Sequence, residues 1–135
     1  MWAAAPERLY ALAAVGVLAQ VAEVADIAEA GEASNDDADH SVELALDGSD
    51  PEDLLVHWVN TALLEAEIRR ALWTRARVLR LEPMGAPTSL MGRLEGPRLD
   101  PARHTLLREV KAVSHHHLGL SLAPGRCRCR LVLDL

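Results

Sequence analysis

Hydrophobic side chains recur at helical spacing in two segments of the chain. The clearer segment is residues 49–68, whose apolar positions follow i, i+1, i+4, i+5, i+8 and i+9: Leu54, Leu55, Trp58, Val59, Ala62 and Leu63. Asp50 can cap the start of this helix, and Pro51 suits its first position. Residues 5–24 show a similar pattern behind Pro6 and Glu7. The sequence therefore predicts two helices.

Alternation of apolar and polar residues predicts strands elsewhere: 41–48, 75–83, 89–96, 110–122 and 126–135. In the last of these, Cys127, Cys129, Leu131, Leu133 and Leu135 share one face, opposite Arg126, Arg128, Arg130 and Asp134. Residues 123–125 are suited to a hairpin connection, 99–107 to a capped turn or short helix, and the acidic stretch 29–40 to a solvated loop.

The order of these elements is helix, strand, helix and then a run of strands. This order predicts an α+β fold in which two helices pack on a mostly antiparallel sheet. The length of 135 residues suits a single domain over residues 1–135, and the hydrophobic half of the composition is enough for a sizeable core.

Composition also indicates the cellular compartment of the protein. It has no run of eighteen apolar residues, so we expect no membrane span. Residues 11–22 could form the core of a signal peptide, but Glu7 beside Arg8 leaves the preceding segment without net positive charge. Cys127 and Cys129 point the same way on one strand, which is poor geometry for a disulfide. We expect a reduced protein of the cytoplasm.

Charge is distributed unevenly along the chain. The net charge is −6, and residues 1–68 hold 15 acidic side chains against one basic residue, Arg8. Residues 69–135 hold 13 basic and 5 acidic side chains. A bipolar molecule can orient against a charged partner. Direct RNA binding is disfavoured, because the chain is not basic overall and it has no Phe and a single Tyr for base stacking.

Three consecutive histidines at 115–117 raise the question of a metal site. Strand alternation places His116 in the core with Val110, Leu118 and Leu120, and directs His115 and His117 to the other face. A zinc site needs three or four converging ligands, and no further Cys/His pair stands at a fixed spacing. The sequence also contains no phosphate-binding glycine loop, no G-x-S-x-G and no H-E-x-x-H.

The C-terminal residues 100–135 resemble the end of the archease family. The matching residues lie in "DPARHTLLREVKAVSHHH": Asp100, Pro101, Arg103, His104, Glu109, Val110, Lys111, Ala112 and His116. Ser114 and His115 stand where the family has Thr and Tyr. Residues 53–64 resemble the family's second helix, and residues 5–21 resemble its first helix.

This resemblance implies a non-enzymatic accessory protein. Archeases promote guanylylation and repeated turnover of the GTP-dependent RNA ligase of tRNA splicing, so the implied partner is that ligase, with tRNA contacted only indirectly. The family binds a divalent cation, usually calcium, through an Asp in an N-terminal His-Thr-Ala-Asp segment and the last two residues. Carried over, the implied metal ligands here are Asp134 and Leu135. The side-chain carboxylate of Asp134 and the terminal carboxylate of Leu135 would offer the oxygen atoms that a hard cation prefers.

One departure concerns the N-terminus. The family's first strand and its His-Thr-Ala-Asp segment have no counterpart before Met1 and Trp2. We expect either a start codon assigned too late or a truncated member with an incomplete metal site, and Trp2 is then the remnant of that strand. Two other functions stay open: an interaction module for other RNA-processing enzymes, and a metal-dependent enzyme that uses Asp134 with His115 and His117.

Overall fold

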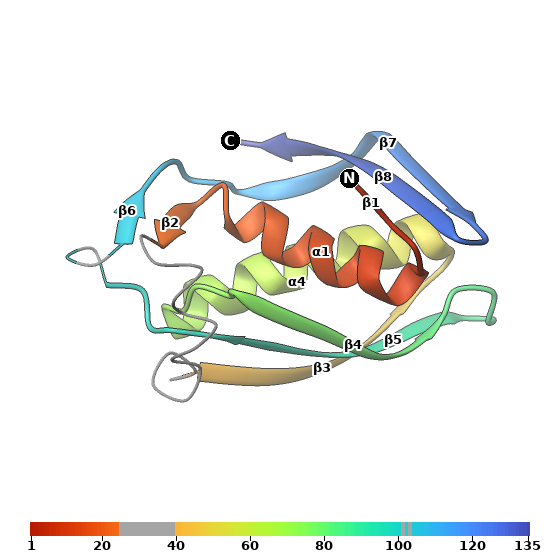
Figure 1. The fold of residues 1–135 in the computed structure, drawn as a ribbon, viewed down its shortest axis with the longest axis horizontal. Helices are drawn as coiled ribbons and strands as arrows, with labels where there is room; N and C mark the ends of the chain where they lie inside the picture. Colours follow the sequence, from red (N-terminus) through yellow and green to blue (C-terminus); the bar gives the residue numbers. More distant parts are fainter. Residues whose placement is uncertain (25–39, 101, 103) are drawn as a thin grey trace.

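Two helices lie between two antiparallel sheets in the computed structural model, which describes residues 1–24, 40–100, 102 and 104–135 (Figure 1). One sheet has the strand order β3-β5-β4, the other has the order β1-β8-β7, and β2 pairs with β6. The elements are β1 (Trp2–Ala3), α1 (Pro6–Leu18), β2 (Ala22–Val24), β3 (His40–Gly48), α4 (Pro51–Arg69), β4 (Arg75–Glu82), β5 (Thr88–Gly96), β6 (His104–Leu106), β7 (Ala112–Ala123) and β8 (Arg126–Asp134).

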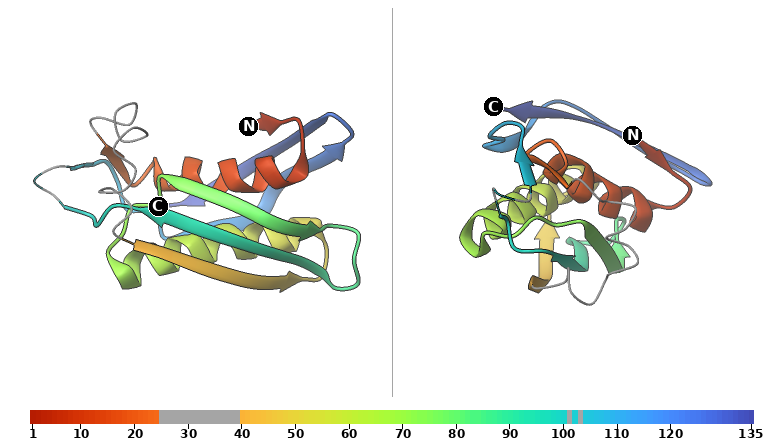
Figure 2. Two further views of the ribbon diagram at one scale, coloured as in Figure 1. Left: turned by 60° about the horizontal axis from the view of Figure 1, so that its bottom comes forward. Right: turned by 60° about the vertical axis from the view of Figure 1, so that its left-hand side comes forward.

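The α+β class and the two helices on antiparallel strands are confirmed. The strands divide into two sheets rather than one, and Figure 2 shows the helices between them from two further directions. The stripe predicted for α4 is buried, and Val56, outside that stripe, is buried as well. A helix covered on two sides must bury more than one stripe, which explains this addition. None of the helices in the described residues is long and apolar enough to cross a membrane.

Helix α4 begins and ends where its sequence dictates. The Asp50 carboxylate accepts a hydrogen bond from the Asp53 N–H at 2.7 Å, and Pro51 occupies the first turn, where its missing N–H costs nothing. The Asp53 carboxylate reaches back to the Ser49 N–H at 3.0 Å. The helix ends at Arg70, which adopts a left-handed conformation with φ of 51°. The predicted cap and first turn are both confirmed.

Three aromatic side chains connect the two helices and the chain around them. The Trp58 indole N–H donates to the carbonyl of Tyr10 at 2.8 Å, and the Tyr10 hydroxyl donates to the carbonyl of Pro51 at 2.6 Å. The Trp73 indole N–H donates to the carbonyl of Ala62 at 3.0 Å. All three side chains are buried, so each polar atom has the partner that burial requires.

Two glycines of β5 allow close approach of the core. A Cβ atom on Gly92 would lie 2.7 Å from the Trp58 ring, and one on Gly96 would lie 1.8 Å from the carbonyl oxygen of Leu72. Any side chain at either position would therefore have to displace its neighbour. This is why α4 and the segment after it can lie directly against β5.

Two predicted boundaries differ in the structure. The first helix stops at Leu18, and Ala22–Val24 forms β2 instead of continuing the helix. In 99–107 the Asp100 carboxylate accepts from the Ala102 N–H, as in a capped turn, but His104–Leu106 forms strand β6 and not a short helix. Pairing with β2 overrides the local helical tendency here. The acidic stretch at 29–39 lies outside the described residues, and His40 is the first residue of β3.

The prediction that His116 is a core residue is wrong. Ser114 pairs with Val132 and Gly119 pairs with Arg130, so four residues of β7 lie opposite Leu131 alone. Three extra residues are an odd number, which reverses the alternation of faces across this bulge. The core therefore takes Val113 before the bulge, and all three histidines at 115–117 are exposed.

Candidate functional site

The C-terminal end of β8 presents the two predicted metal ligands to solvent. Asp134 pairs with Ala112 at the start of β7, and its carbonyl accepts a hydrogen bond from the Lys111 N–H at 2.8 Å. The Asp134 side chain is exposed, and Leu135 is 61% exposed. The backbone is therefore fixed by sheet pairing up to the residue that carries the carboxylate, while the carboxylate itself remains available.

Asn60 of α4 holds the neighbouring strand in place. Its amide group donates to the Val113 carbonyl at 3.1 Å, and its Oδ1 accepts from the Val113 N–H at 2.6 Å. Among the described residues β7 is at the edge of its sheet, so these two backbone groups have no further strand there to pair with. Because Val113 pairs with Leu133, this clamp fixes the last residues of β8 through β7.

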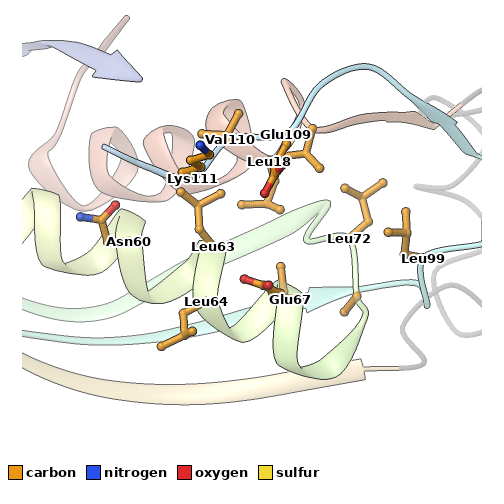
Figure 3. A pocket seen from close by; sticks show the side chains of 13 residues that line it. Leu18, Asn60, Leu63, Leu64, Glu67, Leu72, Leu99, Glu109, Val110 and Lys111 are labelled. Carbon is orange, nitrogen blue, oxygen red and sulfur yellow. The ribbon is translucent and has the colours of Figure 1, made fainter. Parts of the chain in front are cut away.

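A groove of about 380 Å³ lies beside this end of the sheet (Figure 3). Residues 109–111 form one wall, and α4 forms the other with Leu64 and Glu67. Its apolar lining includes Leu18, Leu63 and Leu72, and its charged side chains are Glu67, Glu109 and Lys111. The Lys111 N–H donates to the Asp134 carbonyl, so one wall of the groove is bonded to the backbone of the strand end that carries the exposed carboxylate.

The histidine bulge lies against the start of α4. The His115 Nε2 is 3.0 Å from Oδ1 of Asp53. Hydrogen bonds from the Ser49 backbone and from His115 hold the pKa of Asp53 below its usual range. His116 and His117 place their ring centroids 3.8 Å apart.

The third function considered from the sequence, a metal-dependent enzyme, required Asp134 to join His115 and His117. In the part of the chain that the structure describes, no group of three His, Cys, Asp or Glu side chains is placed to hold a metal ion. His115 instead pairs with Asp53. The structure therefore gives no support to that function.

The two cysteines belong to the core, as the strand pattern predicts. Cys127 and Cys129 are free and buried on the face of β8 that meets the helices. Burial raises the pKa of both thiols, and the carboxylate of Glu7 raises the pKa of Cys127 further. Both changes disfavour the thiolate, the form needed for nucleophilic or metal chemistry.

Sequence reasoning missed two residues that shape this sheet. Asn60 was not singled out, although an amide side chain that directly follows the apolar pair Trp58 and Val59 is a signal for a backbone partner. Trp2 was considered only as a strand remnant. Trp2 lies in β1, where it pairs with Arg128 of β8, and its side chain is 61% exposed.

Comparison with known proteins agrees with this fold and sequence. The whole chain, residues 1–135, matches the Archease protein family (MTH1598/TM1083). The archease of Methanopyrus kandleri is 30% identical over 97 residues, which cover 72% of this chain and 69% of that protein. The archease of Pyrococcus furiosus is 27% identical over 95 residues, which cover 70% and 66%. The match thus spans about two thirds of the length of these curated relatives.

The fold has a counterpart among solved structures. The solution structure of protein 1598 of Methanobacterium thermoautotrophicum superposes with a TM-score of 0.69 at 19% identity, and the match covers 99% of this chain and 89% of that one. At this level of identity the similarity concerns the fold alone. The match of the family along the whole sequence shows that the chain belongs to the archease family.

Proposed function

We propose that this chain is a non-catalytic accessory protein of RNA processing that stimulates a GTP-dependent RNA ligase. The observation that carries the proposal is the match to the archease family along residues 1–135. The geometry is compatible with an accessory role, because the candidate site is an exposed strand end beside an apolar groove. Such a surface suits docking to another protein better than enclosing a small substrate. We place this activity in the cytoplasm.

The proposed site uses the carboxylate of Asp134 and the oxygen atoms of Leu135 as ligands for a divalent cation, with calcium the expected ion. These donors fit a hard cation in type but fill only part of the six to eight positions that calcium takes. When bound, the cation would supply positive charge for contacts with anionic groups of the ligase complex. Strand pairing and the Lys111 N–H hold the Asp134 backbone in place before any ion binds.

The test is a reconstituted ligase assay. The GTP-dependent RNA ligase of the same organism is incubated with labelled GTP, and the covalent ligase–guanylate and the number of ligations per ligase are measured with and without this protein. We expect stimulation by the wild-type chain and its loss on Asp134→Asn, which removes the charge with little change of shape.

Glu82→Gln is the matched control, because Glu82 is also an exposed carboxylate at the last residue of a strand. It should stimulate the ligase as the wild type does. Equal stimulation by Asp134→Asn and wild type would exclude this carboxylate from the site, and no stimulation by the wild type would contradict the proposed function.

The alternative, an interaction module for other RNA-processing enzymes, draws on the groove. Leu64 is 54% exposed at its wall, and Ile68, one turn further along α4, is 66% exposed. Adjacent exposed apolar side chains of this kind mark surfaces that bind proteins. The assay separates the two functions: Leu64→Ser would then reduce binding to several enzymes, and Asp134→Asn would leave binding unchanged.

A further inference from the structure

A row of three arginines covers the outer face of β8. Arg126, Arg128 and Arg130 are exposed, while Cys127 and Cys129 between them are buried against the helices. Residues two apart on a strand project from the same face about 6.6–6.8 Å from each other. The guanidinium groups therefore start from evenly spaced positions along one line, which we call the arginine row.

Small residues lie beside the arginine row and leave it accessible. Arg130 pairs with Gly119, Arg128 with Ser121 and Arg126 with Ala123 on β7. A shallow hollow of about 430 Å³ is lined in part by Arg128 and Arg130 together with Gly119 and Ser121. An elongated ligand can therefore lie along the row without meeting a large side chain from β7.

The arginine row differs from Arg93, in the central strand of the other sheet, because no carboxylate of the described residues pairs with it. No carboxylate of the described residues forms an ion pair with any of its three arginines. On the outer face of the β3-β5-β4 sheet, by contrast, Arg93 lies 3.7 Å from Glu43 and 3.3 Å from Glu95. A single-sign row on a chain of net charge −6 is a local feature, and it fits an anionic partner.

An exposed aromatic ring completes this surface. Trp2 pairs with Arg128 on the side of β8 away from β7. The guanidinium carbon of Arg126 is 5.8 Å from the centre of the Trp2 ring, within the range of a cation–π contact. The ring thus adjoins the arginine row and, at 61% exposure, still offers surface for stacking.

We propose that the arginine row and Trp2 form a binding surface for single-stranded RNA, with phosphates on Arg126, Arg128 and Arg130 and a base on Trp2. Single-stranded nucleic acid supplies a regular line of negative charges together with flat π surfaces, and proteins bind it with a basic track and aromatic rings. An acidic peptide would match the arginines but has no group that requires the indole face. The surface goes beyond the proposed function, since it concerns this chain without the ligase. It departs from the expectation that RNA is contacted only indirectly, because that expectation considered overall charge, Phe and Tyr, and not an exposed Trp beside a local row of arginines.

The experiment measures binding of a short fluorescein-labelled oligouridylate to the full chain by fluorescence anisotropy. With about 0.7 counterions released per phosphate contact on single strands, three contacts predict a slope of about −2 for log affinity against log salt. Arg128→Ala should weaken binding and reduce the steepness of this slope by about 0.7. Trp2→Ala should weaken binding about tenfold through loss of stacking, and Trp2→Phe should retain most of the affinity.

The matched control is the double variant Arg75→Ala, Arg77→Ala, which removes two exposed arginines spaced alike on β4. It should bind as the wild type does, whereas Arg128→Ala, Arg130→Ala should lose most of the affinity. Circular dichroism checks that each variant is folded.

Three results would overturn the proposal. The first is no binding at about 50 mM salt, where electrostatic contacts to nucleic acid are strong. The second is equal weakening by the two double variants. The third is displacement of the RNA by polyglutamate of equal charge together with no effect of Trp2→Ala, which would instead assign the row to an acidic protein segment. None of these measurements contains the ligase, so their failure and that of the proposed function are distinguishable.

Discussion

Replacing Asn60 by Ala tests whether one side chain holds the edge of the β1-β8-β7 sheet. The substitution removes both hydrogen bonds between Asn60 and the backbone of Val113. It keeps the helix intact, because Ala is the best helix former. The Val113 side chain is buried and its strand is at the sheet edge, so no neighbouring strand can take over the two freed backbone groups.

The magnitude follows from the cost of leaving buried polar groups unpaired. Each fully buried group of this kind costs about 1–3 kcal/mol, or about 2–6 kcal/mol for two. Because both hydrogen bonds of Val113 are only part-buried, we expect the lower part of that range, a loss of about 2–4 kcal/mol in the free energy of unfolding. For a chain of this length, that loss corresponds to a fall of about 10 °C in the melting temperature. Asn60→Asp should cost a comparable amount at neutral pH, because it retains the acceptor but directs a second carboxylate oxygen at the Val113 carbonyl.

Urea denaturation followed by circular dichroism gives the free energy, and amide hydrogen exchange gives the local effect. Exchange of the Val113 N–H should accelerate in Asn60→Ala, together with exchange at the paired end of β8. Thr61→Ala, the neighbouring helical position, serves as the control and should change stability by less than about 0.5 kcal/mol. A loss below about 0.5 kcal/mol in Asn60→Ala, or an unchanged exchange rate of the Val113 N–H, would show that the hydrogen bonds of Asn60 to Val113 do not hold this strand in place.

Three further results concern Tyr10, Asp53 and Gly96. Burial raises the pKa of Tyr10, the single tyrosine, so the tyrosine absorbance should not change near pH 10 until the protein unfolds. Above about pH 10 the folded state retains a proton that the unfolded state loses, so the free energy of unfolding should fall as the pH rises. The lowered pKa of Asp53 contributes stability that is present above about pH 4 and is lost as the pH falls through the folded pKa. In urea titrations, Asp53→Asn should therefore destabilise the protein at pH 7 and much less at pH 3. His115→Ala should show a smaller effect of the same sign. Gly96→Ala should lower the melting temperature by more than about 10 °C, because its Cβ would lie 1.8 Å from the Leu72 carbonyl oxygen; an unchanged value would contradict the close approach.

The two helices and the longer strands could be predicted from the sequence because each has a local signal. The apolar stripe and the Asp50 cap define α4, and the alternation of Cys127, Cys129 and Leu131 defines the inner face of β8. The division of the strands into two sheets could not be predicted, because it depends on which strands pair across the helices. Residues 22–24 and 104–106 show the same limit, since they are strands only by pairing with each other.

The metal ligands of the candidate site stay a prediction that rests on the resemblance alone. The resemblance at the C-terminus indicated Asp134 and Leu135, and the structure places both at an exposed strand end. His116 was assigned to the wrong environment because a bulge is invisible to a rule of strict alternation. The exposed character of Trp2 and its contact with Arg126 depend on pairing between the two ends of the chain, which no local pattern encodes.

The two proposed surfaces lie on one face of one strand, and this has a measurable consequence. The exposed positions of β8 alternate without interruption to Asp134, so its carboxylate continues the arginine row about 13 Å beyond Arg130. Without a cation, that carboxylate repels an RNA strand that follows the row, whereas a bound calcium ion would extend the positive charge to the strand end. Calcium and RNA should therefore tighten each other's binding by the same factor. If calcium tightens oligouridylate binding in Asp134→Asn as much as in the wild type, the ion acts elsewhere and the two surfaces are independent.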